Sequence, residues 1–262
     1  MLTAAAGAPR LYAHRGAAAE LPESTLPSFR RALVVGATAL EMDVHLTRDA
    51  HVVVAHDPSG FRMARVPRKI RDSTLEEVRA WDVGRGFTDR GALSGAVFTM
   101  PTLEQVLVEF PGIPINVDAK HPDVAAPLVG LVRRLRRQED VLLTSFDGGT
   151  LQKMRRLGYE GPTGLGRSEV TRLVLLPSAL QRVRPLKGQA AQIPLRSGPF
   201  ALDRPALIAK CHALGLLVHY WTINDPDEAA RLLGLGADGI MTDDPARIAP
   251  VFRDLVTRPC RH

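Results

Sequence analysis

Hydrophobic and polar positions alternate in short blocks along the chain, and each block predicts a strand or a helix. In residues 40–58, LEMDVHLTRDAHVVVAHDP, the polar residues Glu41, Asp43 and His45 alternate with apolar neighbours. This two-residue period is typical of a strand, on which Glu41 and Asp43 share one face. The apolar run 51–56 follows after the polar residues LTRDA, so we expect the two runs to pair as strands.

A strand and then a helix are predicted before this block. The run LYAH, which ends at His14, has the composition of a short strand. After it, Ser24 and Thr25 are candidate helix caps, Pro27 lies in the first turn, and Gly36 provides a stop.

From residue 113 onward, strand candidates and helical patterns follow one another at regular spacing. The strand candidates are INVDAK, LLTSF, PTGL, AAQIP, LVHYWTI and GIMTD. Asp225 before Pro226 and Asp244 before Pro245 place an acidic cap ahead of a proline at the first helical position. With LYAH and LEMDV, the pattern predicts eight strands alternating with helices, as in a closed (β/α)8 TIM-type barrel. An open doubly wound sheet is less favoured, because no glycine-rich phosphate loop follows an early strand.

Residues 57–112 interrupt this alternation. Two capping patterns, Ser73 to Glu76 and Thr102 to Gln105, predict short helices within them. We therefore expect a single barrel domain over residues 1–262, with an inserted segment at about 57–112 after the second strand region.

Composition places the chain among globular proteins, with 45% hydrophobic and 24% charged residues. Its apolar runs are far shorter than the roughly 20 residues of a transmembrane helix, and the start lacks the pattern of a secretory signal. We therefore expect a soluble protein in the cytoplasm. Cys211 and Cys260 lie far apart, so neither a disulfide framework nor a structural zinc site is indicated.

The net charge of +6 includes the arginine run 133–138, RRLRRQ. Leu131 and Leu135 are spaced to face the core of a helix, which leaves the arginines on a solvated outer face. No aromatic residue interleaves with these arginines, so stacking on single-stranded nucleic acid is not predicted. The oligomeric state is left open.

Polar and charged residues recur where the predicted strands end. They are His14 and Arg15, then Glu41 and Asp43, Asp118 and Lys120, and finally Trp221 and Asn224. In a TIM-type barrel the carboxyl ends of the strands meet at one rim, where active sites lie. Because a buried charge must be paired or bound to a metal, a shared ligand would account for the whole set.

The residue types indicate a metal and a phosphate. Glu41, Asp43 and Asp118 provide hard oxygen ligands, which suit Mg²⁺ or Ca²⁺, with Mn²⁺ also possible. Arg15 and Lys120 are the two kinds of cationic side chain that most often hold phosphate.

His14 and His56 are the candidates for proton transfer, since an imidazole titrates near neutrality. His45 shares the face of the carboxylates but lies beyond them and is not included. The remaining histidines are interpreted as surface or structural residues: His51, His121, His212, His219 and His262.

The motifs AHRG, PEST, ALEMDVHLTRDAHVVVAHDP, NVDAK, TSF, HYWTIN and ADGIMTDDP, in this order, resemble the glycerophosphodiester phosphodiesterase family. The resemblance implies a (β/α)8 barrel with a divalent cation that hydrolyses glycerophosphodiesters to an alcohol and glycerol phosphate. It makes His14 and His56 the acid and base, and assigns the phosphate to Arg15 and Lys120. The metal would be bound by Glu41, Asp43 and Asp118. Phe146 and Trp221 would line the pocket.

Three positions depart from the family's pattern. Asp118 stands where the family usually has Glu, Ser24 replaces Asn in the P-E-N-T motif, and Ala50 replaces Gly in a D-G turn, which predicts a different turn. The Asp118 change also fits the related lysophospholipase D and sphingomyelinase D barrels, which act on lipids. A non-catalytic barrel that binds phosphodiesters is the alternative of another class. The nucleophile, either water or the substrate's own hydroxyl, stays open.

Overall fold

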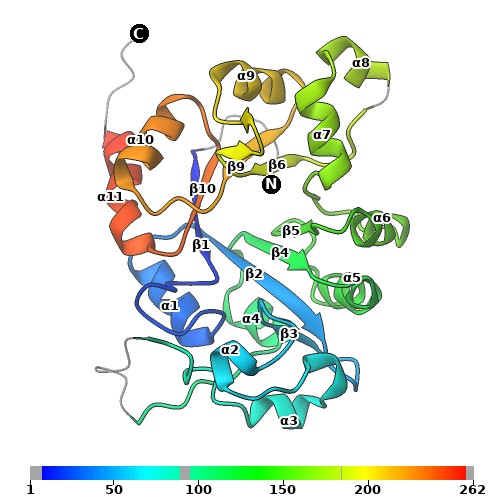
Figure 1. Ribbon diagram of the computed structural model, residues 1–262, viewed down its shortest axis with the longest axis vertical. Coiled ribbons are helices and arrows are strands. Elements are labelled where there is room, and N and C mark those ends of the chain that lie inside the picture. The colour runs from blue at the N-terminus through cyan, green and yellow to red at the C-terminus, as the bar shows by residue number, and fades with distance from the viewer. Residues whose placement is uncertain (1–7, 89–94, 184, 258–262) are drawn as a thin grey trace.

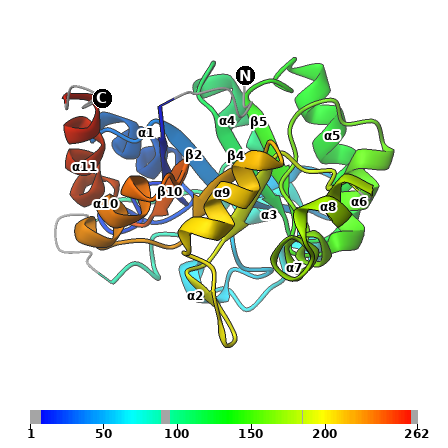
Figure 2. The same cartoon turned by 90° about the horizontal axis from the view of Figure 1, so that it is seen from above.

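The computed structural model describes residues 8–88, 95–183 and 185–257 of the chain. Strands occupy the centre, and helices surround them (Figures 1 and 2). Cys260 and His262 lie outside the described residues.

The central strands form a parallel ring. They are β1 (Arg10–His14), β2 (Ala39–Leu46), β4 (Ile115–Ala119), β5 (Val141–Thr144), β6 (Ala190–Ile193), β9 (Leu217–Tyr220) and β10 (Gly239–Thr242). Neighbours pair in the order β5, β4, β2, β1, β10, β9, β6. Thr163 then pairs with Leu143 of β5, and Gly164 pairs with Ala190 of β6, both in parallel. The segment PTGL thereby closes the ring, and the prediction of a (β/α)8 TIM-type barrel is confirmed.

Helices follow the strands and cover the outside of the ring (Figure 2). They are α1 (Leu26–Val34), η3 (Pro122–Val124), α5 (Ala125–Arg134), α6 (Gly148–Arg156), α7 (Arg167–Leu175), α8 (Ser178–Val183), α9 (Pro205–Ala213), α10 (Pro226–Gly234) and α11 (Pro245–Thr257). A small hairpin of β7 (Arg196–Ser197) and β8 (Phe200–Ala201) lies between β6 and α9. Within the described ranges, no helix is long and apolar enough to cross a bilayer.

The predicted helix caps are present. The Thr25 side chain accepts a hydrogen bond from the amide of Ser28 at the start of α1. The Asp225 side chain accepts from the amides of Asp227 and Glu228 at the start of α10. Asp244 does the same for the amide of Arg247 in α11. Each side chain satisfies backbone donors that the first helical turn leaves without an intrahelical partner.

Alternation along β2 sends its charged residues into the barrel. Leu40, Met42 and Val44 pack with Phe29 of α1 in one buried apolar cluster. Glu41 and Asp43 therefore point to the opposite, inner side of the strand, as the two-residue period requires. Polar contacts also cross the interior: Gln192 of β6 donates to Asn116 of β4, at 3.2 Å, although these strands are not neighbours.

The segment between β3 and β4 has a core of its own. β3 (Val52–Val54) pairs with β2, as predicted, and the pairing is antiparallel. The helices that follow are α2 (Phe61–Ala64), η1 (Ile70–Asp72), α3 (Leu75–Arg79) and α4 (Leu103–Glu109). Trp81, Phe98 and Met100 belong to the buried apolar cluster of this segment. Figure 1 shows α2 and α3 at one end of the molecule, beside β3.

The capping predictions in this segment are half right. Thr102 and Gln105 form the expected capping box at α4. At α3, however, the capping box joins Thr74 and Glu77, one residue later than predicted. The hydroxyl of Ser73 is engaged elsewhere, since it donates to the carbonyl of Lys69.

Arg137 departs from the predicted solvated face. The helix α5 ends at Arg134, and Arg137 turns inward, where it is only 8% exposed. Its guanidinium donates to the carbonyls of Leu107, Phe110 and Ile113, and its Nε lies 2.8 Å from Asp140. The prediction was wrong for this residue, because three distant carbonyl groups and the nearby Asp140 offset the cost of burying its charge.

Candidate active site

The predicted charged residues meet at the carboxyl ends of the strands. His14 is the last residue of β1 and is paired in register with Glu41 of β2. Asp43 of β2 lies directly opposite Asp118 of β4. The register therefore brings together groups that are more than 70 residues apart in sequence.

Two cationic side chains neutralise part of this carboxylate group. The Nζ atom of Lys120 lies 2.6 Å from Oδ1 of Asp43 and 2.6 Å from Oδ2 of Asp118. The Nε atom of Arg15 lies 3.3 Å from the other oxygen of Asp43. Burial raises the pKa of Asp118, and the charge of Lys120 opposes that rise.

Glu41 differs from the two aspartates. It is 4% exposed and accepts a hydrogen bond from the backbone amide of Arg15, but within the described residues it forms no ion pair with lysine or arginine. Burial, together with the charge of Asp43, raises its pKa to about 8. The ionised form of Glu41 thus lacks a full counter-charge among the described residues.

The structure describes no ready-made cluster of three or more histidine, cysteine or acidic side chains that could hold a metal ion. Lys120 occupies the position between Asp43 and Asp118. The donor set nevertheless fits a hard divalent cation, because it consists of carboxylate oxygens and includes the under-neutralised Glu41.

His14 is held by a carboxylate on one side of its ring. Its Nδ1 atom lies 2.7 Å from Oδ1 of Asp243, and the amide of Asn224 donates to Oδ2 of Asp243 at 3.0 Å. Its Nε2 atom faces Glu41 at 3.9 Å. Burial lowers the pKa of His14, but the hydrogen bond with Asp243 and the charge of Glu41 outweigh burial, so the pKa is raised.

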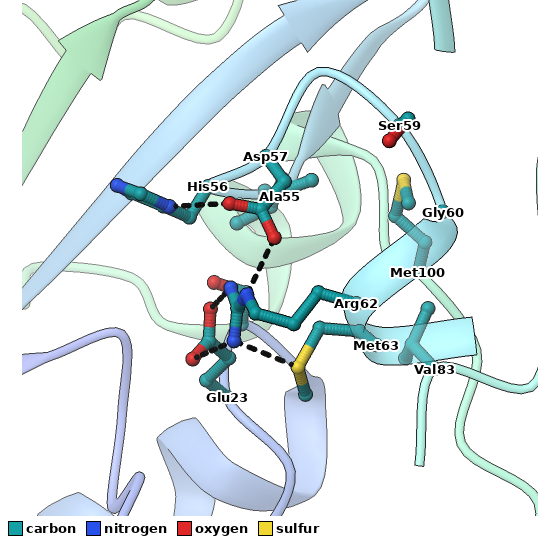
Figure 3. Close-up of a pocket in the computed structure, with 12 residues that line it drawn as sticks. Glu23, Ala55, His56, Asp57, Ser59, Gly60, Arg62, Met63, Val83 and Met100 are labelled. Atoms are coloured by element: carbon teal, nitrogen blue, oxygen red, sulfur yellow. Dashed lines mark hydrogen bonds and ion pairs between the residues drawn. The ribbon is translucent and has the colours of Figure 1, made fainter. Parts of the chain in front are cut away.

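His56 has a similar arrangement. Its Nδ1 atom lies 2.8 Å from Oδ1 of Asp57, and Oδ2 of Asp57 accepts from Nε of Arg62 at 2.5 Å (Figure 3). Burial opposes the ionisation of Asp57, but the hydrogen bonds from Arg62 and His56 prevail and lower its pKa. Both histidines therefore leave Nε2 available, as a proton-transfer residue requires.

The comparison with protein families decides the identity of the chain. The sequence model of the Glycerophosphoryl diester phosphodiesterase family matches residues 14–247. The chain belongs to this family. The family membership predicted from the motifs is confirmed, as is the prediction of an enzyme.

Individual relatives agree with the family. A glycerophosphodiester phosphodiesterase of Caldanaerobacter subterraneus subsp. tengcongensis is 28% identical over 93% of this chain and 97% of its own length. A lysophospholipase D of Rattus norvegicus is 28% identical over 94% of this chain and 87% of its own. Among solved structures, an Oleispira antarctica phosphodiesterase in complex with the product sn-glycerol-3-phosphate has a TM-score of 0.74 and 25% identity, covering 94% of this chain and 97% of that one.

In this family member, Phe146 contacts both Trp221 and Lys120. Their rings meet edge to face with centroids 5.6 Å apart, and Nζ of Lys120 is 5.5 Å from the centroid of Phe146. Phe146 is 66% exposed. The two aromatic residues follow β5 and β9, so they border the same rim as the charged cluster.

Two of the three departures lie at residues with a positive φ. Ala50 has a φ of 64°, the left-handed conformation that glycine favours. Ser24 also has a positive φ, of 58°, and its buried hydroxyl has no hydrogen-bond partner among the described residues.

Sequence reasoning missed the carboxylates that hold the histidines. Asp243 directly follows β10, so the strand-end rule that identified Asp118 could have identified it too. Asp57 follows His56 in the sequence, where an H-D pair is a visible signal. Arg62 and Glu23 had no such signal, because their contact joins residues that are 39 positions apart.

Proposed function

We propose that this protein hydrolyses glycerophosphodiesters to an alcohol and glycerol phosphate, with a divalent cation and a pair of histidines. The observation that carries the proposal is the arrangement of His14 and His56. Each has Nδ1 on a carboxylate, which directs Nε2 away from that carboxylate, and Nε2 of His14 lies 3.9 Å from Glu41.

Phosphate binding is assigned to Arg15 and Lys120. Both lie on the carboxylate group at the rim, and a guanidinium and an ammonium neutralise phosphate oxygens as charge builds toward the transition state. Glu41, Asp43 and Asp118 would hold the cation, with Mg²⁺, Ca²⁺ and Mn²⁺ as the candidates. When bound, the cation would supply further positive charge to the phosphate oxygens.

The histidines divide the proton transfers. His14 takes a proton from the attacking hydroxyl, which belongs to water or to the substrate's own glycerol, as the new P–O bond forms, and His56 donates a proton to the alcohol oxygen as the old P–O bond breaks. The carboxylates support this division, because Asp243 is hydrogen-bonded to the neutral Asn224 whereas Asp57 is paired with the cationic Arg62. More uncompensated negative charge therefore lies beside His14, which favours proton acceptance there.

Glycerol phosphate as the product is supported by the Oleispira antarctica phosphodiesterase, whose structure holds sn-glycerol-3-phosphate. A lysophospholipase D activity is the second candidate. It is supported by the Rattus norvegicus relative and by the exposed Phe146 at the rim, which could contact an acyl chain.

The test is turnover of glycerophosphocholine and lysophosphatidylcholine in parallel, with choline release as the readout. We expect the wild type to convert glycerophosphocholine, and His14→Ala and His56→Ala to lower turnover by about 10² to 10⁴. His212→Ala is a matched control. His212, on α9, also forms a His–Asp pair, with Asp238, but this pair lies away from the proposed site. Preference for lysophosphatidylcholine would favour the second candidate, and near-full activity in both folded histidine variants would refute the mechanism.

A further inference from the structure

Arg62, on the inserted helix α2, lies at the centre of a chain of charged contacts. Its Nε donates to Oδ2 of Asp57 at 2.5 Å, and its two terminal nitrogens donate to the two oxygens of Glu23 at 2.6 and 3.0 Å. Figure 3 shows the guanidinium between these two carboxylates. The planar group is thus held on both of its hydrogen-bonding edges, a geometry that lysine does not provide.

The chain of contacts continues to the proposed acid, His56, and to the proposed phosphate-binding residue, Arg15. The other oxygen of Asp57 lies 2.8 Å from Nδ1 of His56. Oε1 of Glu23 also accepts from Arg15 at 3.3 Å. Arg62 therefore connects the residue that holds Nδ1 of His56 with a neighbour of the phosphate-binding Arg15.

We propose that Arg62 is a positioning residue, which fixes Asp57 and thereby orients His56 and keeps its Nδ1 protonated, with Nε2 facing the substrate. This inference rests on the proposed function, in which His56 protonates the leaving alcohol. It gives the inserted segment a role in catalysis, although none of its side chains needs to touch the substrate.

The packing of the segment supports a fixed position for Arg62. Its backbone carbonyl packs against Gly86, where an added Cβ would lie only 2.1 Å from the carbonyl oxygen. The amide of Gly86 donates to the carbonyl of Met63 at 2.7 Å. At the start of α2, an added Cβ on Gly60 would lie 2.7 Å from the ring of Trp81. Close backbone contacts at both glycines hold α2 against the core of the segment.

A pocket open to solvent lies beside this network, with Met63, Val83 and Met100 among its lining residues. In Figure 3 the imidazole of His56 points away from these three residues, and Asp57 and Arg62 lie between. Asp57 and Arg62 therefore separate the His56 ring from these three lining residues. This arrangement supports a positioning role for Arg62 over a direct contact with the leaving alcohol.

The partial exposure of Arg62 makes it possible to distinguish a positioning role in turnover from a contribution to the stability of the fold. Its side chain is 44% exposed, and exposed ion pairs contribute little to stability, typically about 0 to 1 kcal/mol. A displacement of a catalytic group by about 1 Å can nevertheless cost about 10²-fold in rate. Loss of Arg62 should therefore affect turnover much more than folding.

The experiment compares Arg62→Gln with the matched control Arg68→Gln. Arg68 also pairs with a glutamate of the inserted segment, Glu77, at 2.9 Å, but it is not connected to His56. On glycerophosphocholine we expect Arg62→Gln to lower kcat by about 10- to 100-fold with KM little changed, Arg62→Lys to recover part of the loss, and Arg68→Gln to stay within about 2-fold.

A second substrate identifies the step that is affected. Glycerol phosphate esterified with p-nitrophenol releases p-nitrophenolate, which needs no proton from His56, so the loss in Arg62→Gln should shrink to about 3-fold or less. An equal loss on both substrates would overturn the positioning role, as would wild-type kcat in Arg62→Gln. A wild type that hydrolyses neither substrate would overturn the proposed function and this inference together, whereas an active wild type with an unaffected Arg62→Gln would overturn only the inference.

Discussion

The Nζ atom of Lys120 lies 2.6 Å from Oδ2 of Asp118. The same atom is equally close to Oδ1 of Asp43, so one ammonium group bridges two buried carboxylates that face each other on neighbouring strands. Two carboxylates that both contact one ammonium group could not both stay ionised without a cation between them or beside them. A divalent cation on these carboxylates would replace the charge that Lys120 now supplies, which would leave Lys120 for phosphate.

Replacing Lys120 tests this relationship. In chelator, Lys120→Met should destabilise the fold by at most about 3 kcal/mol, because two buried carboxylates lose their partner while the lysine side chain is itself 20% exposed. Added Mg²⁺ or Ca²⁺ should then raise the Tm of this variant more than that of the wild type. Lys153→Met is the control, since Lys153 donates to the carbonyl of Pro122. A metal-dependent rise in Tm that is no larger in Lys120→Met would contradict the shared site.

The pH dependence should report on Asp243. Because the hydrogen bond with Asp243 raises the pKa of His14 against the effect of burial, the rise of kcat/KM with pH should be centred above the ordinary histidine value of about 6.5. Asp243→Asn removes a negative charge that favours the imidazolium ion, so the pKa of His14 should fall and the rise should move to lower pH. We also expect kcat to fall by about 10²-fold, as the ring loses its orientation.

The control for this profile is Asp238→Asn, which alters the His–Asp pair of His212 outside the proposed site. Its pH profile should match that of the wild type. If the profile of Asp243→Asn also coincides with the wild type, His14 is not the base that the account requires.

Backbone strain at Ala50 gives a prediction on stability. A left-handed conformation costs an L-residue about 1 to 2 kcal/mol, and the extra freedom of glycine in the unfolded chain offsets about 0.4 to 1 kcal/mol of the gain. Ala50→Gly should therefore stabilise the protein by about 0.5 to 1 kcal/mol in urea denaturation. Ala80→Gly, at a helix end with a φ of −75°, should have the opposite sign. Destabilisation by Ala50→Gly would argue against the positive φ.

The fold was predictable because its signals are local. The alternation around Glu41, the acidic caps before Pro226 and Pro245, and the regular spacing of apolar runs all depend on a few neighbouring residues. The convergence of His14, Glu41 and Asp118 followed from the barrel itself, since parallel strands end at one rim.

The contacts that could not be predicted join distant segments. Arg137 is buried because acceptors on α4 and the loop after it lie within reach, and nothing in RRLRRQ distinguishes it from its neighbours. The pairing of Arg62 with Glu23 depends on where the inserted segment packs, and the position of Lys120 between two carboxylates depends on strand register.

The most direct measurement is turnover of glycerophosphocholine after removal of bound metal by dialysis against chelator, followed by addition of single divalent cations. We expect the rate to fall by at least about 10²-fold and to return with Mg²⁺, Ca²⁺ or Mn²⁺, whereas Glu41→Gln should respond weakly to any of them. An unchanged rate in protein that elemental analysis shows to be free of metal would contradict the proposal that Glu41, Asp43 and Asp118 bind a catalytic cation.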